Sequence, residues 1–259
     1  LHGSALGGFA GITGWHDGDP APPWGAYTDF ISPRYGLSAL SAALHYRDQT
    51  GIGQCIDISQ IESSIHFLGP AILDYTENGR VLDRAGHDSE RGCPHGVYAT
   101  EGTERYIAID CQTSEQWWAL RDQIPGLSDV GGDELGELSA RLSRRVELDK
   151  ALVSHCAGQE AKAFSQTLRE AGVPAYAVLR PTDFHADPQL VDRGFFIELE
   201  HTGFGKSTFD GPVTNYSKTP SSPTHAGPLI GEHTFEVMKD ILGYTDEEIS
   251  EIAAAEALS

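Results

Sequence analysis

Apolar positions recur at helical spacing in the first part of the chain. One face of the predicted helix carries three leucines, Leu37, Leu40 and Leu44. Gly51 ends this run, while Ser32 suits the N-cap position and Pro33 suits the first helical position. Asp29 is therefore expected just outside a helix N-terminus.

A short strand and a second helix are predicted next. Residues 54–58 have the pattern of a strand, and Ser59 with Glu62 three residues later forms a capping box at the start of a helix. Pro70 is expected to perturb that helix. This helix–strand–helix order within residues 1–78 corresponds to one wind of an α/β layer, which needs further strands to pack against.

The middle of the chain has an α+β pattern. Residues 79–95 are rich in glycine, proline and charge, which predicts a linker and a mobile loop. Residues 96–180 are expected to form a small α+β domain, with a hairpin around Gly102 and a helix capped by Thr113 and Gln116. The remaining elements of this domain are three helices and a strand, at 134–145, 147–157, 160–171 and 174–179.

Residues 181–259 are predicted as an extended return arm with little core of its own. A hairpin is expected at 198–212, followed by an irregular proline-rich stretch and two short helices. Such an arm is stable only when it packs on the large domain or on a partner. The predicted fold class is thus α/β, with a large-domain segment, a smaller α+β domain and this arm.

Composition narrows the class of protein. The chain has 259 residues, of which 39% are hydrophobic, enough for a sizeable core in one or two domains. No run approaches the roughly 18 apolar residues that span a bilayer, and residues 1–10 lack the charged start of a signal peptide, so we predict a cytoplasmic protein. The cysteines have no CxxC spacing, so neither a zinc site nor a disulfide framework is indicated. The sequence also contains no GxSxG, P-loop or HExxH motif.

Asp29 is the candidate for chemistry. Partial positive charge at a helix N-terminus favours an ionised carboxylate, and such a carboxylate without a fixed cationic partner can attack an acyl carbon. An aspartate at this place is more often only a capping or solvated loop residue. The spacing alone leaves both interpretations open.

Several separated segments carry a common resemblance. They read GITGWHDG at 11–18, GAYTDFISPR at 25–34, GQCIDISQIE at 53–62, PHGVY at 94–98, ADPQLVDRG at 186–194, GEHTFEV at 231–237 and LGYTDEEI at 242–249. In this order they resemble the class III CoA-transferases, the group that contains formyl-CoA transferase and carnitine CoA-transferase. Members commonly carry a complete N-terminal nucleotide-fold region before the matching aspartate, whereas 28 residues precede Asp29 here. The chain is therefore expected to be a C-terminal portion of such an enzyme or a separately encoded subunit.

The resemblance implies a CoA-transferase that moves CoA from an acyl-CoA donor to a carboxylic acid acceptor. In the family, the aspartate that matches Asp29 attacks the donor thioester and forms a mixed anhydride, which released CoA converts into an aspartyl-CoA thioester. Oxyanion stabilisation is expected from backbone N–H groups near this aspartate, with Tyr27, Thr28 and Phe30 as candidates.

A flexible loop covers the intermediate in the resembled family, and residues 86–92 occupy the corresponding place. Gly86 and His87 are therefore candidate active-site loop residues, although the loop is poor in glycine. His95 and Gly96 open the small domain and are candidates for the cleft, with a structural turn as the alternative.

The resemblance also implies a fold and partners. It implies a partial nucleotide-binding-type α/β large domain and two interlocked chains in a dimer, with CoA and acyl-CoA as substrates, no permanently bound cofactor and no metal. The formal charge of −20 argues against a nucleic-acid partner, because binding a phosphate backbone requires clustered Lys and Arg. CoA is itself a polyanion, so its phosphates are expected to be neutralised by a homo- or hetero-oligomeric partner that supplies the N-terminal half. A solvated acidic surface is the simpler explanation of the charge.

Two alternatives remain open. α-Methylacyl-CoA racemases resemble these transferases and place an aspartate at a similar position as an acid or base, although their other proton-transfer residue would lie upstream of this chain. The second alternative is a noncatalytic subunit that completes a dimer, and the presence of Asp29 argues against it.

Overall fold

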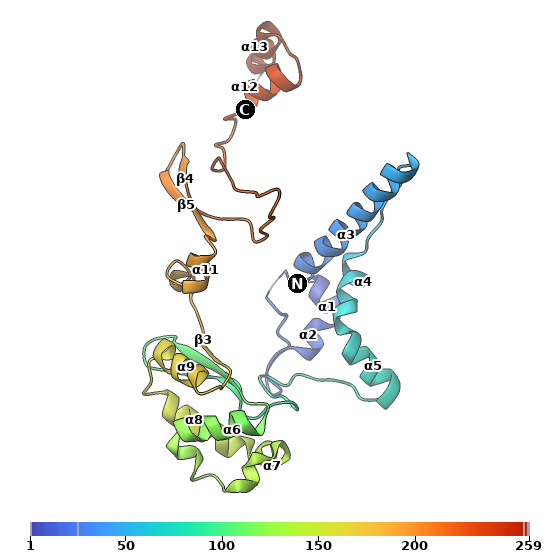
Figure 1. The fold of residues 1–259 in the computed structure, drawn as a ribbon. Helices are drawn as coiled ribbons and strands as arrows, with labels where there is room; N and C mark the ends of the chain where they lie inside the picture. The colour runs from blue at the N-terminus through green and yellow to red at the C-terminus, as the bar shows by residue number, and fades with distance from the viewer. Residues whose placement is uncertain (1, 25, 256, 258–259) are drawn as a thin grey trace. The chain divides into compact units, whose positions relative to one another are not determined.

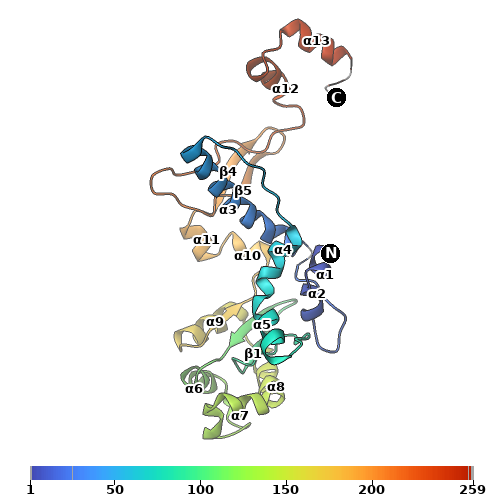
Figure 2. The ribbon, with the colours of Figure 1, turned by 90° about the vertical axis from the view of Figure 1, so that its right-hand side faces the viewer.

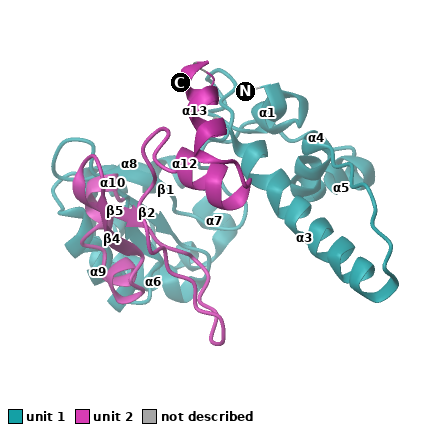
Figure 3. Ribbon diagram, turned by 90° about the horizontal axis from the view of Figure 1, so that it is seen from above, with its two compact units in different colours: residues 1–178 teal, residues 179–259 magenta. Residues whose placement is uncertain are grey.

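The computed structural model describes residues 2–24, 26–255 and 257. Leu1 and Gly25 of the predicted first segment, and residues 256, 258 and 259 of the predicted return arm, lie outside the described residues. The chain divides into two units, Leu1–Val178 and Leu179–Ser259 (Figure 3). The predicted boundaries at residues 78 and 95, inside the first unit, stay predictions.

Helices fill the first part of the first unit (Figure 1). The elements are α1 (His2–Leu6), α2 (Phe9–Ile12), α3 (Tyr27–Thr50), α4 (Gln60–Ile65), the 3-10 turn η1 (His66–Leu68) and α5 (Gly69–Asn78). Helices α1, α3 and α4 contact one another, but the apolar side chains that this part of the chain buries are few, chiefly Phe9 and Ile31. These helices therefore pack together without a sizeable core of their own.

The long helix α3 begins earlier than the sequence predicted. It starts at Tyr27, so Ser32 is not its N-cap and Pro33 lies inside it. Asp29 accordingly lies in the first helical turn, not outside the helix. Proline has a φ that suits a helix but cannot donate to the carbonyl four residues earlier, here that of Asp29. Pro33 is therefore helical, as predicted, but it is not the first helical residue, because α3 begins six residues earlier and continues through it.

Residues 54–58 do not form the predicted strand. They belong to no sheet in the described part of the chain. Ile52, Ile56 and Ile58 are 58%, 38% and 36% exposed, and the three leucines of the predicted α3 face are exposed as well. A strand requires hydrogen-bonded neighbours. The segment remains extended coil because no described strand pairs with it.

The second predicted helix is confirmed, with the expected break. The Glu62 N–H donates to Oγ of Ser59 at 3.2 Å, which is one half of the predicted capping box. Helix α4 ends at Ile65, and α5 starts at Gly69 with Pro70 in its first turn. Proline is tolerated there because its missing N–H would have no intrahelical acceptor.

A three-stranded antiparallel sheet and four helices enclose the core of the first unit. Strand β2 (Tyr106–Asp110) pairs with β1 (His95–Ala99) on one side and with β3 (Ala175–Ala177) on the other. The helices are α6 (Ser114–Gln123), α7 (Leu138–Ser143), α8 (Arg145–Cys156) and α9 (Ala161–Glu170). The core between them includes Ile107, Ile109, Trp117, Leu148 and Leu168. This core begins at Cys93, near the end of the predicted linker and loop, and includes no described residue before it.

Most predicted elements of this region are confirmed. The hairpin around Gly102 forms, and Thr113 and Gln116 make both hydrogen bonds of a capping box at α6. Two further 3-10 turns, η2 (Pro125–Leu127) and η3 (Asp133–Gly136), lie between α6 and α7. The predicted helix at 134–145 was wrong in extent, because its first turn is η3 and the α-helical part is the shorter α7.

Arg141 is a buried cation that links three segments of this core. The residue is 0% exposed. Its guanidinium donates to the carbonyls of Cys93 at 2.6 Å, Leu135 at 3.0 Å, Gly136 at 2.8 Å and Gln112 at 3.3 Å. These bonds connect the segment just before β1, the segment just after β2 and the turn before α7.

The second unit has little core of its own. Strands β4 (Phe196–His201) and β5 (Gly205–Asp210) lie side by side as the predicted hairpin (Figure 2). The helical elements are short: α10 (Pro181–Phe184), α11 (Pro188–Asp192), α12 (Thr234–Glu236), the π-helical turn η4 (Val237–Ile241) and α13 (Asp246–Ala254). Met238 and Ile249 are the buried apolar residues among those described in this unit. The packing of this arm on another domain or chain stays a prediction.

The cysteines differ in accessibility, which gives a test of the fold. Cys55 is exposed, whereas Cys93, Cys111 and Cys156 are buried. Burial raises the pKa of the Cys93 thiol, that of Cys111 to about 12 and that of Cys156 to about 11, so these thiols stay protonated and unreactive in mildly alkaline buffer. We expect iodoacetamide to alkylate Cys55 alone in the native protein and all the cysteines after denaturation, as measured by peptide mass spectrometry. Native labelling of a buried cysteine as fast as Cys55 would contradict this packing.

Candidate active site

Asp29 lies in the first turn of α3, at the positive end of the helix dipole. Its N–H donates to the carbonyl of Ala26 at 2.9 Å, and Ala26, the N-cap residue, supplies no side-chain cap. The carboxylate is exposed and pairs with no cation among the described residues. Asp29 therefore places a carboxylate without a described cationic partner at a helix end that favours negative charge.

Gln60 holds the side chain of Asp29, and the sequence reasoning missed it. The Nε2 group of Gln60 donates to Oδ1 of Asp29 and to Oγ1 of Thr28, the latter at 2.9 Å. Thr28 is buried, so its hydroxyl gives the amide a second, fixed contact. Gln60 is the first residue of α4, directly after the N-cap Ser59, so the start of α4 lies against the first turn of α3. The sequence feature that could have identified Gln60 is its place in the segment at 53–62, which carries the family resemblance.

Two pockets open beside Asp29, and Asp29 lines both of them. The first has a volume of about 330 Å³ and includes Ser32, Gly36 and Ile58 in its lining. The second has a volume of about 450 Å³ and extends to α1. Asp29 and Gln60 line both pockets. A ligand can therefore reach the carboxylate without displacing a packed side chain.

The oxyanion candidates differ in the availability of their N–H groups. Tyr27 and Thr28 are the first two residues of α3, and N–H groups at these positions have no intrahelical acceptor. Phe30 lies one residue beyond Asp29, where a helical N–H ordinarily donates to the carbonyl of the N-cap residue, here Ala26. The amides of Tyr27 and Thr28 therefore suit an oxyanion better than that of Phe30, and the assignment stays a prediction.

The predicted active-site loop has fixed contacts at its start. The Gly86 N–H donates to the carbonyl of Gly14 at 2.9 Å, and the rings of His87 and Trp15 pack with centroids 4.8 Å apart. Gly86 has a φ of +57°, and a Cβ at this position would lie 2.3 Å from the Trp15 ring. Both observations require glycine here. Trp15 belongs to the segment at 11–18, so the loop is held by a residue far from it in sequence.

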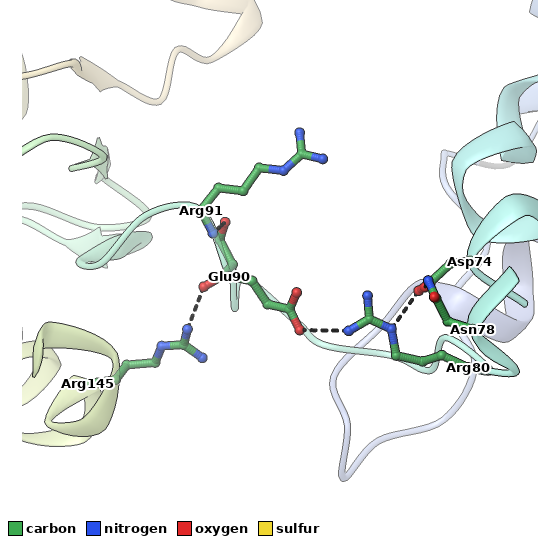
Figure 4. A network of polar contacts seen from close by, with 7 residues as sticks. Asp74, Asn78, Arg80, Glu90, Arg91 and Arg145 are labelled. Carbon is green, nitrogen blue, oxygen red and sulfur yellow. Dashed lines mark hydrogen bonds and ion pairs between the residues drawn. The ribbon is translucent and has the colours of Figure 1, made fainter. Parts of the chain in front are cut away.

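Ion pairs hold the rest of the loop from two sides, and Figure 4 shows those of Arg80 with Glu90 and Asp74. On one side, Arg145 of α8 pairs with Asp88 at 2.6 Å. On the other side, Arg80 contacts Glu90 at 3.5 Å and Asp74 of α5 at 2.6 Å. The hydrogen bond from Arg80 holds the pKa of the Asp74 carboxyl below its usual value. The loop thus has several side-chain contacts, and its function as a lid stays a prediction.

His87, His95 and Gly96 meet at one cavity. The Nδ1 atom of His95 lies 2.6 Å from the carbonyl oxygen of His87. The cavity has a volume of about 280 Å³, and its lining also includes Ala108 and Tyr176 of the sheet. The structure therefore brings together three of the predicted active-site residues, while Asp29 lines the two pockets at α3.

The described residues offer no site for a metal ion. No group of three or more His, Cys, Asp or Glu side chains among them could hold one. In the same part of the chain, none of the helices combines the length and the apolar character that crossing a membrane would need.

Known proteins are similar to this chain in sequence and in fold. The sequence profile described as CoA-transferase family III matches residues 1–234. Succinyl-CoA:glutarate CoA-transferase of Homo sapiens is 28% identical over 254 residues, and the beta subunit of succinyl-CoA–L-malate CoA-transferase of Chloroflexus aurantiacus is 29% identical over 252 residues. These matches cover 97% and 96% of this chain but 57% and 62% of the relatives, so the chain spans less than two thirds of their length. The crystal structure of a CAIB/BAIF family protein from Brucella suis has a TM-score of 0.80 at 22% identity, over 92% of this chain and 61% of that one.

Proposed function

Because the chain belongs to CoA-transferase family III, we propose that it carries the nucleophile of an enzyme that moves CoA from an acyl-CoA to a carboxylic acid. The observation that supports this most directly is the Asp29 carboxylate, which is exposed, unpaired with any described cation and held by Gln60 at the start of α3. A carboxylate nucleophile suits this exchange because it is close in energy to the carboxylates that are exchanged.

The proposed reaction passes through two kinds of covalent intermediate. A carboxylate oxygen of Asp29 attacks the donor thioester carbonyl, so that a C–O bond forms, the C–S bond breaks and CoA leaves as a thiolate. The thiolate attacks the Asp29 carbonyl of the mixed anhydride and displaces the donor carboxylate, which leaves an aspartyl-CoA thioester. The acceptor carboxylate attacks this thioester, and the released thiolate then attacks the acceptor carbonyl of the second anhydride. Asp29 is regenerated with no net change in protons or electrons.

Two features of the site support these steps. Each addition to a carbonyl develops an oxyanion, and the N–H groups of Tyr27 and Thr28 are donors without intrahelical acceptors close to Asp29. Gln60 binds one oxygen of the Asp29 carboxylate, which leaves the other oxygen for attack and limits rotation of the group.

The names of the relatives suggest the class of acid. Succinate, glutarate and malate, which the two relatives act on by name, each carry two carboxylates. We infer that the donor and acceptor acids of this enzyme are dicarboxylic acids as well. The CoA phosphates would bind to cations that this chain, with a formal charge of −20, does not cluster, so we propose that another part of the assembled family fold supplies them.

Trapping of the intermediate tests the covalent mechanism. The natively assembled protein would be exposed to succinyl-CoA, treated with borohydride or hydroxylamine, and digested for mass spectrometry of peptides across residues 24–34. We expect modification at Asp29. An unmodified Asp29 in an assembly that binds CoA would instead favour a racemase, in which the aspartate acts as an acid or base, or a noncatalytic subunit.

Gln60→Leu is expected to lower kcat for CoA transfer about 10- to 100-fold. The leucine side chain fills a similar volume but cannot donate to the carboxylate, so Asp29 would sample unproductive orientations. Steady-state assays of CoA transfer would measure the change. Gln49→Leu, at an exposed position near the end of α3, is the matched control and should change kcat less than about 2-fold. An unchanged kcat in Gln60→Leu would remove Gln60 from the site.

A further inference from the structure

One oxygen of the Asp29 carboxylate is hydrogen-bonded before any reaction begins. The Nε2 group of Gln60 donates to Oδ1 of Asp29 and, at 2.9 Å, to Oγ1 of Thr28, so both of its N–H bonds are used. Among the described residues, none donates a hydrogen bond to Oδ2 of Asp29. Oδ2 is therefore the oxygen that can attack a thioester while Oδ1 stays bonded to Gln60.

The bonded oxygen is also the one on which charge develops in the middle of the proposed reaction. After Oδ2 has attacked, Oδ1 is the carbonyl oxygen of the Asp29 anhydride and then of the aspartyl-CoA thioester. When the CoA thiolate or the acceptor carboxylate adds to this carbonyl carbon, an electron pair of the C=O bond moves onto Oδ1 and returns as the leaving group departs. In the first and last steps, the oxyanion lies instead on the carbonyl of the donor or the acceptor.

The packing of α1, α3 and α4 fixes the Gln60 amide in place. Thr28, which accepts its second N–H, is 3% exposed, and a Cβ at Gly3 of α1 would lie 2.5 Å from the Thr28 hydroxyl oxygen. Gln60 is the first residue of α4, and the Oγ of its N-cap Ser59 accepts from the N–H of Glu62 at 3.2 Å. A donor that is already oriented needs no reorganisation when charge develops in front of it.

Both pockets beside Asp29 adjoin this amide. Asp29 and Gln60 line each of them, so a nucleophile that enters from either pocket meets a carbonyl bonded to the same donor. The amide is neutral and transfers no proton. It can therefore donate to the carboxylate, the carbonyl and the oxyanion in turn, and its hydrogen bond is strongest to the charged forms.

We propose that Gln60 is the oxyanion donor for attack on the Asp29 carbonyl and that Thr28 is a positioning residue that holds the Gln60 amide. This inference rests on the proposed function. It divides the stabilisation of charge between two sets of donors, because the backbone N–H groups of Tyr27 and Thr28 would serve the carbonyls of the substrate acids. A glutamine that only oriented the Asp29 nucleophile would assist formation of the anhydride but not attack on a preformed thioester.

Hydroxylamine attack on the preformed aspartyl-CoA thioester tests the assignment. The natively assembled protein would be incubated with succinyl-CoA, freed of ligands by gel filtration and mixed with hydroxylamine, and intact mass spectrometry would follow the protein-bound CoA. Hydroxylamine attacks the same carbonyl and needs no acceptor site. Relative to the same thioester in urea-denatured protein, we expect Gln60→Leu to lower the rate constant about 100-fold. The exposed control Gln49→Leu should change it less than about 2-fold.

Two variants of Thr28 extend the test to the positioning residue. Valine has nearly the shape of threonine but no hydroxyl, whereas serine keeps the hydroxyl. We expect the thioester of Thr28→Val to react about 10-fold more slowly than that of wild type, and the thioester of Thr28→Ser to react within about 2-fold of it. Infrared difference spectra with isotope-labelled aspartate should place the thioester C=O stretch at higher frequency in Gln60→Leu and Thr28→Val, because a carbonyl that loses a hydrogen bond has a stiffer C=O bond.

The outcomes separate this inference from the proposed function. Equal hydroxylamine rate constants, or equal C=O frequencies, in wild type and Gln60→Leu would overturn the inference and leave Gln60 as a residue that only orients the Asp29 nucleophile. If Gln60→Leu accumulates no thioester, the same two measurements on Thr28→Val decide. A wild type that binds CoA but never retains it covalently would contradict the proposed function itself.

Discussion

Asp29→Asn is expected to lower CoA transfer by at least about 10³-fold while the fold is unchanged. The amide has nearly the same shape as the carboxylate, and Gln60 has both a donor and an acceptor to offer it, so the packing at the start of α3 should persist. The amide is a poor nucleophile and cannot form the anhydride that the proposed mechanism requires. Steady-state transfer assays and circular dichroism, on wild type and variant in the same assembly, would measure both properties.

Asp48→Asn is the matched control for this loss. Asp48 lies on the same helix, is exposed and pairs with its neighbour Arg47. Removing its charge should change transfer less than about 2-fold, because exposed ion pairs contribute little. Transfer by Asp29→Asn above about a tenth of the wild-type rate would show that Asp29 is not the nucleophile, and Asp29→Ala would exclude reversion of asparagine to aspartate as the source.

Arg141→Met is expected to destabilise the core of the first unit by about 3–5 kcal/mol. Methionine fills much of the space that arginine leaves but donates no hydrogen bond. The carbonyls of Cys93, Gln112, Leu135 and Gly136 would lose the guanidinium, and the interaction of the guanidinium with the Trp117 ring, 5.7 Å from its centroid, would be lost as well. Urea unfolding followed by circular dichroism and tryptophan fluorescence would give the difference in the free energy of unfolding.

Arg144→Met provides the comparison for Arg141→Met. Arg144 is near Arg141 in sequence but half-exposed, and its partner is Glu147 on the surface. The same substitution there removes an ion pair without leaving buried carbonyls unpaired, so the free energy of unfolding should stay close to that of wild type. If the two variants unfolded at the same urea concentration, the carbonyl contacts of Arg141 would not stabilise the core.

The region from β1 to β3 could be predicted from the sequence because its signals are local. Thr113 and Gln116 cap α6 across three residues, and Gly172, with a φ of +90°, ends α9 where the sequence placed its end. The shortened helix before α8 is the exception. There the segment around Gly136 forms a 3-10 turn whose carbonyls bond to Arg141, a contact that local patterns do not encode.

The site could be predicted only in part for the same reason. Asp29 was proposed as the nucleophile through the family resemblance, because its position beside a helix start is common and does not by itself indicate catalysis. Gln60 lies 31 residues from Asp29 in sequence, and Trp15 lies far from Gly86, so neither contact follows from spacing or periodicity. The start of α3 was misplaced because Pro33 is compatible with more than one helical position. The absent strand at 54–58 has another cause, since strand formation depends on a neighbour that no local pattern supplies.

The unpaired segment at 54–58 also affects the tendency of the isolated chain to aggregate. It belongs to no described sheet and is accompanied by the exposed Ile52, Ile56 and Ile58. Apolar extended segments with free edges pair with one another when chains are concentrated. Heterologous production of this chain by itself would therefore be limited by inclusion-body formation, and the soluble yield obtained with different co-expressed polypeptides would report which of them covers this edge.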